Sequence, residues 1–187
     1  MNRIGDEGAA ALVKNSIWIK LEELNLHQNQ IGDPGAIALG NNTNWKELKK
    51  LVLSVNKITD DGATGIGKNT SWINLEELYL NQNQIGDKGA IAIGSNVMWK
   101  KLKKLSLEMN DIGDDGTMGI GKNTSWTNLE QLYLYENEIG DKGAIAIGSN
   151  TTWRNLKELY LDQNRIGDEG GELIGSNTAW INLEKLY

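Results

Sequence analysis

The sequence of 187 residues contains no cysteine and no phenylalanine, and it has only one proline and one histidine. The absence of cysteine excludes disulfide bonds, a thiolate nucleophile and cysteine-ligated zinc sites. The single histidine, His27, limits imidazole catalysis to one residue, and nothing in the sequence places a serine and an aspartate beside it. We therefore expect a chain that is not an enzyme and that holds no metal and no cofactor.

Positive charge and long apolar segments are also scarce. The 19 Lys and Arg residues are outnumbered by 25 Asp and Glu residues, whereas a nucleic-acid-binding surface needs a clustered basic face. No apolar run approaches the roughly 20 residues that span a bilayer, and the first ten residues lack the apolar centre of a signal peptide. These features predict neither a nucleic-acid nor a membrane partner. They favour a cytoplasmic location, with a secreted effector as the alternative.

Glycine is abundant, with 22 residues, and so uneven a composition is typical of a copied unit. A period of 27 residues runs through the whole chain and is clearest in the tryptophans, which are Trp18, Trp45, Trp72, Trp99, Trp126, Trp153 and Trp180. Asparagines from Asn2 to Asn164 and isoleucines from Ile4 to Ile166 keep the same step. The period predicts almost seven units in one domain, 1–187, without a linker.

Each unit begins with the pattern L-x-x-L-x-L-x-x-N-x-I, as in LEELYLNQNQI at 75–85, and continues with G-D-x-G-A-x-x-I-G. These motifs resemble the ribonuclease-inhibitor-like class of leucine-rich repeat proteins. The resemblance implies an α/β right-handed solenoid, a horseshoe arc with a parallel β-sheet on its concave face and short helices on its convex face. The period is slightly shorter than is usual for the class, and Trp replaces the usual aliphatic residue at one corner. Because both ends fall within a unit, we expect a fragment of a longer array.

Alternation within the L-E-E-L-Y-L segment predicts which side chains are buried. Leu78 and Leu80 are expected to point into the core, while Glu77 and Tyr79 point to the concave face. An asparagine follows each strand, at Asn83 and its equivalents. Because its amide both donates and accepts hydrogen bonds, a stack of such residues is expected to bridge successive turns as a ladder.

The G-D-x-G motif precedes a short apolar segment and predicts the start of a helix. Asp33 and its equivalents are expected to be N-cap residues, and Pro34 fits the first helical position. A calcium ladder is the alternative, but the nonapeptide of calcium-binding β-rolls is absent. The glycines within each helix are expected to allow close approach of helix to strand.

The tetrapeptide Asn-Thr-Ser-Trp at 69–72 and 123–126 contains the acceptor pattern for an N-linked glycan. However, an asparagine recurs before the tryptophan in every unit, whether or not an acceptor pattern is complete. We therefore expect this corner asparagine to adopt the left-handed conformation that ends a helix, and the tryptophans to stack on one another.

Two outward columns at the strand starts carry charges whose signs alternate from strand to strand. Glu22, Lys49 and Glu76 illustrate one column. Opposite charges on adjacent strands predict cross-strand ion pairs with a structural role.

The central concave column holds four of the five tyrosines, and the fifth lies two residues along the chain from one of them. Tyrosine is enriched at interfaces because it combines apolar area with a hydroxyl and loses little entropy, although it also simply suits a strand. We expect a basic or polar polypeptide segment to bind across a partner-binding patch made of Tyr79, Glu108, Tyr133, Tyr135, Glu136, Tyr160 and Asp162.

The best functional prediction is a non-catalytic protein-interaction scaffold that binds a partner on its concave face. Alternatives are a regulatory or targeting arm of a larger enzyme or effector, of the GTPase-activator or ubiquitin-ligase type, and an adhesive or glycan-binding surface. The last strand, 183–187, leaves an unpaired edge that predicts a homodimer. The sequence does not identify the partner.

Overall fold

The computed structural model describes residues 2–187, and this part of the chain alternates helices and strands. The helices are α1 (Asp6–Val13), α2 (Asp33–Gly40), α3 (Asp60–Gly67), α4 (Asp87–Gly94), α5 (Asp114–Gly121), α6 (Asp141–Gly148) and α7 (Asp168–Gly175). The strands are β1 (Glu23–Asn25), β2 (Lys50–Val52), β3 (Glu77–Tyr79), β4 (Lys104–Ser106), β5 (Gln131–Tyr133), β6 (Glu158–Tyr160) and β7 (Lys185–Leu186).

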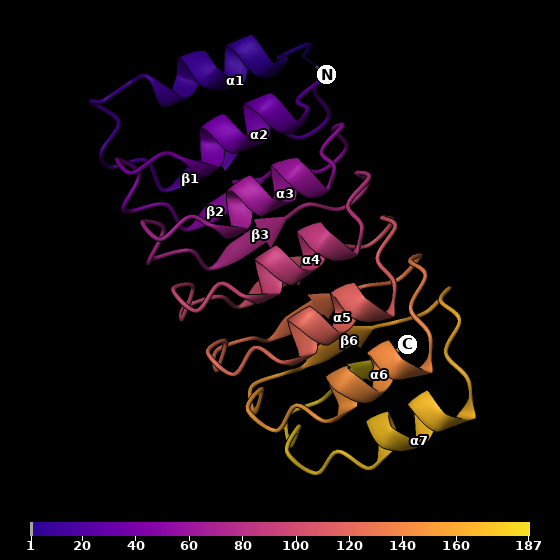
Figure 1. Cartoon of the computed structure of the whole chain (residues 1–187). Coiled ribbons are helices and arrows are strands. Elements are labelled where there is room, and N and C mark those ends of the chain that lie inside the picture. Colours follow the sequence, from indigo (N-terminus) through magenta and orange to yellow (C-terminus); the bar gives the residue numbers. More distant parts are fainter. Residues whose placement is uncertain (1) are drawn as a thin grey trace.

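The strands form one parallel sheet in the order in which they occur in the chain. Each strand pairs with the next at a shift of one repeat, so that Leu24 lies beside Leu51 and Leu51 beside Leu78. Figure 1 shows the helices stacked side by side as a layer beside the sheet, with the two chain ends at opposite ends of the stack. This is the predicted α/β solenoid, and the face of the sheet turned away from the helices is called the concave face below.

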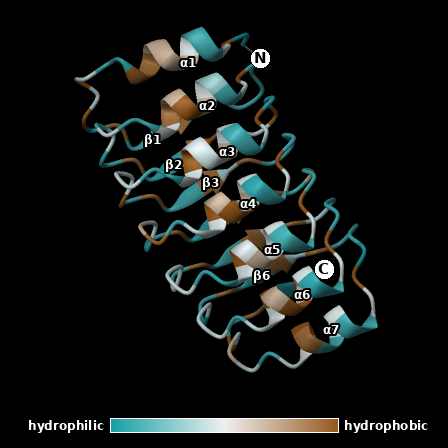
Figure 2. Cartoon of the chain, viewed as in Figure 1, coloured by the Kyte–Doolittle hydropathy of each residue, from teal (hydrophilic) through white to brown (hydrophobic). Residues whose placement is uncertain are grey.

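The core lies between the sheet and the helix layer. The leucines within and just after the inner strands, such as Leu78 and Leu80, are fully buried, as are helix residues such as Ala90 and Ile93. Each helix begins with an aspartate, and Figure 2 shows it hydrophilic where it begins and more hydrophobic toward its end. A buried leucine stabilises the fold by about 1.5–3 kcal/mol, so the repeated aliphatic residues provide the main stabilising contribution.

The asparagine ladder is confirmed. The Oδ1 atom of Asn110 accepts a hydrogen bond from the backbone amide of Ile85 at 3.0 Å. Its Nδ2 atom donates to the carbonyls of Leu80 and Leu107, at 3.1 and 2.9 Å. Asn110 thus provides hydrogen-bond partners for buried backbone groups of its own turn and of the preceding turn. These groups lie outside the helices and strands, so regular secondary structure does not pair them.

The predicted N-cap role of the aspartates is wrong in its detail. The N-cap of each helix from α2 onwards is the residue before the aspartate, glycine or, in α3, threonine, and it makes no side-chain capping bond. The Asp87 carboxylate instead accepts hydrogen bonds from the amides of Gly113 and Gly116, both at 2.8 Å, at the start of the next helix. Neighbouring helices lie side by side with their N-termini aligned. The aspartate of each helix from α1 to α6 therefore caps the N-terminus of the next helix.

The corner asparagines also differ from the prediction. In residues 2–187 none of them has a positive φ, and that conformation falls instead on the residue before each ladder asparagine, such as Gln82 at φ 53°. The hydrogen bonds of Asn69 hold the corner in place. Its Oδ1 accepts from the amides of Ser71 and Trp72, and its Nδ2 donates to two carbonyls of the preceding repeat. An N-linked glycan would attach at the Nδ2 atom. In the folded chain this atom donates two hydrogen bonds, and the Asn69 side chain is buried.

All the tryptophans except Trp18, which is 39% exposed, are core residues, but they do not form the predicted stack. Trp45, Trp72, Trp99, Trp126 and Trp153 are fully buried. The aromatic ring pairs found in the described part of the chain join tyrosines, and none joins two tryptophans. The indole Nε1 of Trp126 donates to a carbonyl of the preceding repeat, that of Asn96, at 3.1 Å, and so links one corner to the next.

The helix glycines allow close approach, but of helix to helix and not of helix to strand. A Cβ atom added at Gly94 would lie 2.5 Å from the carbonyl carbon and oxygen of Gly119 in the neighbouring helix. A side chain at this position would separate the helices, and the strand spacing of about 4.8 Å leaves little room for that on the sheet side.

Candidate partner-binding face

The strand register assembles an aromatic row on the concave face. Tyr133 lies beside Tyr160 in the sheet, and their ring centroids are 4.7 Å apart in an edge-to-face arrangement. Tyr160 and Tyr187 are stacked, also at 4.7 Å. Aromatic pairs at such separations contribute about 0.5–1.5 kcal/mol beyond their buried area. The row is therefore ordered before any partner binds.

Carboxylates on the same face fix the tyrosine hydroxyls. The Tyr133 hydroxyl donates to Glu158 at 2.7 Å, and the Tyr79 hydroxyl donates to Glu77 at 2.8 Å. Burial and then these bonds raise the pKa of both phenols well above the usual value, so they remain neutral donors. The Lys185 ammonium and the Tyr133 hydroxyl together lower the pKa of Glu158.

A gap interrupts the aromatic row at Ser106, which lies in register between Tyr79 and Tyr133. The Nζ atom of Lys104 occupies this gap, 5.2 Å from the Tyr79 ring centroid and 4.5 Å from the Tyr133 centroid. Lys50 contacts Tyr79 alone, at 5.4 Å. The gap adjoins a shallow hollow of about 430 Å³ that Tyr79 and Lys104 help to line.

A buried carboxylate lies beside the gap. Glu108 is only 6% exposed, and its Oε2 atom accepts a hydrogen bond from the Ser106 hydroxyl at 2.6 Å. Burial raises the pKa of Glu108, while the Ser106 hydroxyl and the Lys104 charge act in the opposite direction. The structure thus holds a carboxylate on the concave face that has little solvent to stabilise its charge.

Three acidic residues that follow β4, β5 and β6 lie close enough to Tyr135 for their charges to act on it; they are Glu108, Glu136 and Asp162. Burial raises the pKa of Tyr135, and the charges of Glu108, Glu136 and Asp162 add to the effect. In residues 2–187 none of these three carboxylates forms an ion pair, whereas Glu138 pairs with Arg165 at 3.0 Å. The partly exposed Glu136 and Asp162 therefore present negative charge on the C-terminal half of the concave face that no ion pair in the described residues offsets.

The charged columns at the strand starts form most of the predicted cross-strand pairs, but within residues 2–187 Lys104 forms none. The ion pairs joining successive strands are Lys49–Glu22, Lys50–Glu77, Lys103–Glu76, Lys157–Glu130 and Lys185–Glu158. Most of these side chains are partly exposed, and such pairs contribute about 0–1 kcal/mol; the Glu158 side chain, 13% exposed, is the most buried. These charges neutralise one another within the sheet.

The structure brings the predicted patch together in part. Tyr133 and Tyr160 are in direct contact, and Glu108, Glu136 and Asp162 lie around Tyr135. The predicted patch omitted Lys104 and Ser106. A serine flanked by tyrosines in the concave column was visible in the sequence, but the position of the lysine amine was not.

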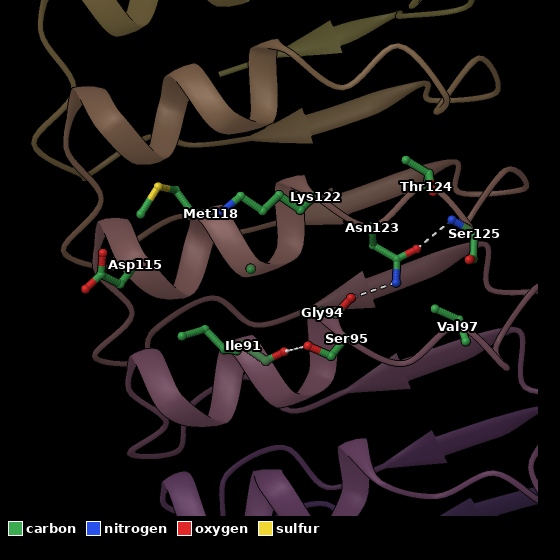
Figure 3. A pocket seen from close by; sticks show the side chains of 11 residues that line it. Ile91, Gly94, Ser95, Val97, Asp115, Met118, Lys122, Asn123, Thr124 and Ser125 are labelled. Carbon is green, nitrogen blue, oxygen red and sulfur yellow. Dashed lines mark hydrogen bonds between the residues drawn. The ribbon is translucent and has the colours of Figure 1, made fainter.

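A second hollow, of about 550 Å³, lies on the convex side between α4 and α5. Figure 3 shows Ile91 and Met118 on adjacent helices along it, with Lys122 and Asp115 also at its edge. The Asn123 side chain within it is engaged in the corner hydrogen bonds described for Asn69.

Two further searches of the described residues 2–187 concern metals and membranes. No group of three or more histidine, aspartate or glutamate side chains there is arranged to hold a metal ion. None of the helices in this part is long and apolar enough to cross a membrane.

A leucine-rich repeat family model matches residues 1–13, 19–40, 47–67, 73–94, 100–121, 127–148 and 154–175, which together exceed half of the chain. The chain belongs to the leucine-rich repeat family. Proteins of this family are in general interaction scaffolds. No curated protein matches the sequence.

Solved structures of leucine-rich repeat proteins share the fold. An internalin (inlF) from Listeria monocytogenes is 23% identical with a TM-score of 0.57, and the match covers 94% of this chain and 49% of that one. Internalin C2 (inlC2) from the same organism is 23% identical with a TM-score of 0.58, over 98% of this chain and 75% of that one. The chain thus spans about half the length of the first internalin, and these likenesses concern the fold alone.

Proposed function

We propose that this leucine-rich repeat chain is a non-catalytic scaffold that binds a basic polypeptide segment across the C-terminal half of its concave face. The carrying observation is the ordered row of Tyr133, Tyr160 and Tyr187 beside carboxylates that lack ion pairs. Tyrosines supply contact area at low entropic cost, and unpaired carboxylates favour a cationic partner.

The direction of the segment follows from the sheet. Strands lie about 4.8 Å apart and an extended chain rises about 3.3 Å per residue, so a peptide crossing β4, β5 and β6 would reach a new strand about every one and a half residues. Apolar parts of the segment would lie on Tyr133 and Tyr160, and its lysines or arginines would lie near Glu108, Glu136 and Asp162. The charges at the strand starts are already paired and contribute less to such recognition.

A displayed random-peptide library tests the proposal. Selected peptides should be enriched in lysine and arginine, and a double Tyr133→Ala, Tyr160→Ala variant should bind them at least about 30-fold more weakly, as for interface hot spots. The matched control is Ile91→Ala, Met118→Ala on the convex side, which should bind like the parent chain. Affinity unchanged by loss of both tyrosines would contradict the proposal, provided that thermal unfolding shows both variants folded.

We also propose that β7 mediates self-association. Within the described residues it pairs on one side only, with β6, and Leu186 and Tyr187 are 49% and 61% exposed. An edge strand with exposed apolar side chains is a template for pairing with another chain. Sedimentation velocity should show dimers that dissociate on dilution and that Leu186→Lys abolishes. A monomer at all concentrations would contradict this.

A further inference from the structure

We infer that the gap between Tyr79 and Tyr133 is a cation-binding slot, held in this structure by Lys104, and that an arginine of the partner segment takes its place. The inference rests on the proposed function, because the slot lies on the same concave face. It adds a specific partner residue and a specific position to that function.

The geometry of the slot follows from one small residue. Tyr79 and Tyr133 are two strands apart, which places them roughly 10 Å from each other. Ser106 between them is too short to fill the space, whereas Val52 occupies the corresponding place on the other side of Tyr79. Tyr133 and Tyr160, at 4.7 Å, leave no such space. The slot is thus bounded by two aromatic rings and accommodates one cationic group.

Lys104 differs from the other lysines of its column. Lys50 pairs with Glu77 at 3.3 Å, and Lys185 pairs with Glu158 at 2.8 Å. Within residues 2–187, Lys104 makes no ion pair; its amine lies at cation–π distance from the two rings, and its charge also lowers the pKa of Glu108 and of Glu158. Cation–π contacts contribute about 0.5–2 kcal/mol. An occupant held without an ion pair can be displaced by a better cation.

Arginine suits the slot better than the resident lysine. A guanidinium is planar, stacks on aromatic faces and is more weakly hydrated than an ammonium. Its five donors form charge-assisted bonds with carboxylates, and the buried carboxylate of Glu108 lies beside the slot, linked to Ser106. The unpaired Glu136 and Asp162 on the following strands favour the approach of a cationic segment.

The first experiment measures a small probe. N-acetyl-arginine amide should shift the NMR signals of the Tyr79 and Tyr133 rings in a saturable way, and the uncharged isostere N-acetyl-citrulline amide should not. Lys104→Gln vacates the slot and should raise the affinity for the arginine probe roughly threefold. The matched control Lys49→Gln removes the same charge from the adjoining column, at a residue that pairs with Glu22, and should leave the affinity unchanged. Equal effects of the two substitutions, or equal shifts by both probes, would overturn the inference.

A second variant separates the slot from the wider function. Tyr79→Leu removes one wall of the slot but leaves the Tyr133–Tyr160 pair intact, so it should abolish binding of the arginine probe. Selected peptides should lose affinity with this variant only if they contain arginine. If arginine peptides lose binding with Tyr133→Ala, Tyr160→Ala but keep full affinity for Tyr79→Leu, the proposed function stands and the slot is wrong.

Discussion

The Asp87 carboxylate accepts a hydrogen bond from the amide of Gly113, which belongs to the next repeat and is the N-cap of α5. The same oxygen accepts from Gly116 in the first turn of that helix. The Gly116 amide, at the third helical position, is one that an N-cap side chain would satisfy, and the Gly113 amide is the one that a capping box would satisfy from within the same helix. In this chain the capping group comes from the neighbouring helix, so capping also joins the repeats.

Replacing Asp87 with alanine should therefore destabilise the chain by about 1–2 kcal/mol, the usual cost of losing a helix cap. Asp168 is the matched control, because it occupies the same place in α7 and within the described residues makes no such bond. Asp168→Ala should change stability by less than about 0.5 kcal/mol. Urea unfolding of both variants measures the difference, and equal losses would show that the interrepeat bond contributes nothing.

Close packing of the helices gives a second prediction, at Gly94. Alanine there would bring its Cβ to 2.5 Å from backbone atoms of Gly119, so we expect a loss of about 3 kcal/mol or more. Gly175 occupies the equivalent position in α7 and has nothing within 4 Å. Gly175→Ala should be neutral or stabilise the chain by up to about 1 kcal/mol, because alanine favours a helix. Thermal unfolding that shows a similar effect at both positions would contradict the packing argument.

The asparagine ladder gives a third prediction. Asn110→Asp keeps an oxygen that can accept from the amide of Ile85 but removes the amide that donates to Leu80 and Leu107. Two buried carbonyls then lose a donor and face a carboxylate, so we expect a loss of about 3 kcal/mol or more at neutral pH. The exposed Asn128, which donates one bond to Lys100, is the comparison. Asn128→Asp should cost less than about 1 kcal/mol by chemical denaturation.

Local periodicity was sufficient to predict the repeat, the buried leucines and the ladder. The alternation around Leu78 and Tyr79 sets the face of the sheet on which each residue lies. The roles of Asp87 and Asn69 could not be obtained in this way, because a cap within the same repeat explains their recurrence as well as bonds to a neighbouring repeat, 26 to 29 residues away, do. Recurrence shows that a residue is needed but not which turn of the solenoid it serves.

Parts of the candidate site could likewise be predicted from the sequence, and other parts could not. Parallel register turns the concave column into a row of neighbours, so the contact between Tyr133 and Tyr160 was predictable. The alternating charges likewise predicted the ion pairs. The position of the Lys104 amine was not predictable, because a lysine side chain is long and flexible and both Glu77 and the two tyrosine rings lie within its reach.

The buried carboxylate of Glu108 gives the last prediction, which concerns pH. Burial raises its pKa in the folded chain, so the folded state holds the proton more tightly than the unfolded state. The stabilisation linked to this proton is complete below the unfolded pKa of about 4.3 and is lost as the pH rises through the higher folded pKa. Glu108→Gln carries no charge at any pH and can still accept from Ser106. It should therefore be more stable than the parent chain at pH 7, and the gain should shrink toward pH 4.

Urea unfolding at pH 4 and pH 7 measures this difference. Glu136→Gln removes a negative charge from the same face at a more exposed position and is the control. The gain for Glu108→Gln at pH 7 should exceed that for Glu136→Gln, because desolvation penalises the Glu108 charge more strongly. If Glu108→Gln were equally stabilising at both pH values, the ionisation of this carboxylate would not be the cause. If it were destabilising at pH 7, favourable interactions of the Glu108 charge would outweigh its desolvation. The Lys104 charge, which lowers the pKa of Glu108, would then be the source of that stabilisation.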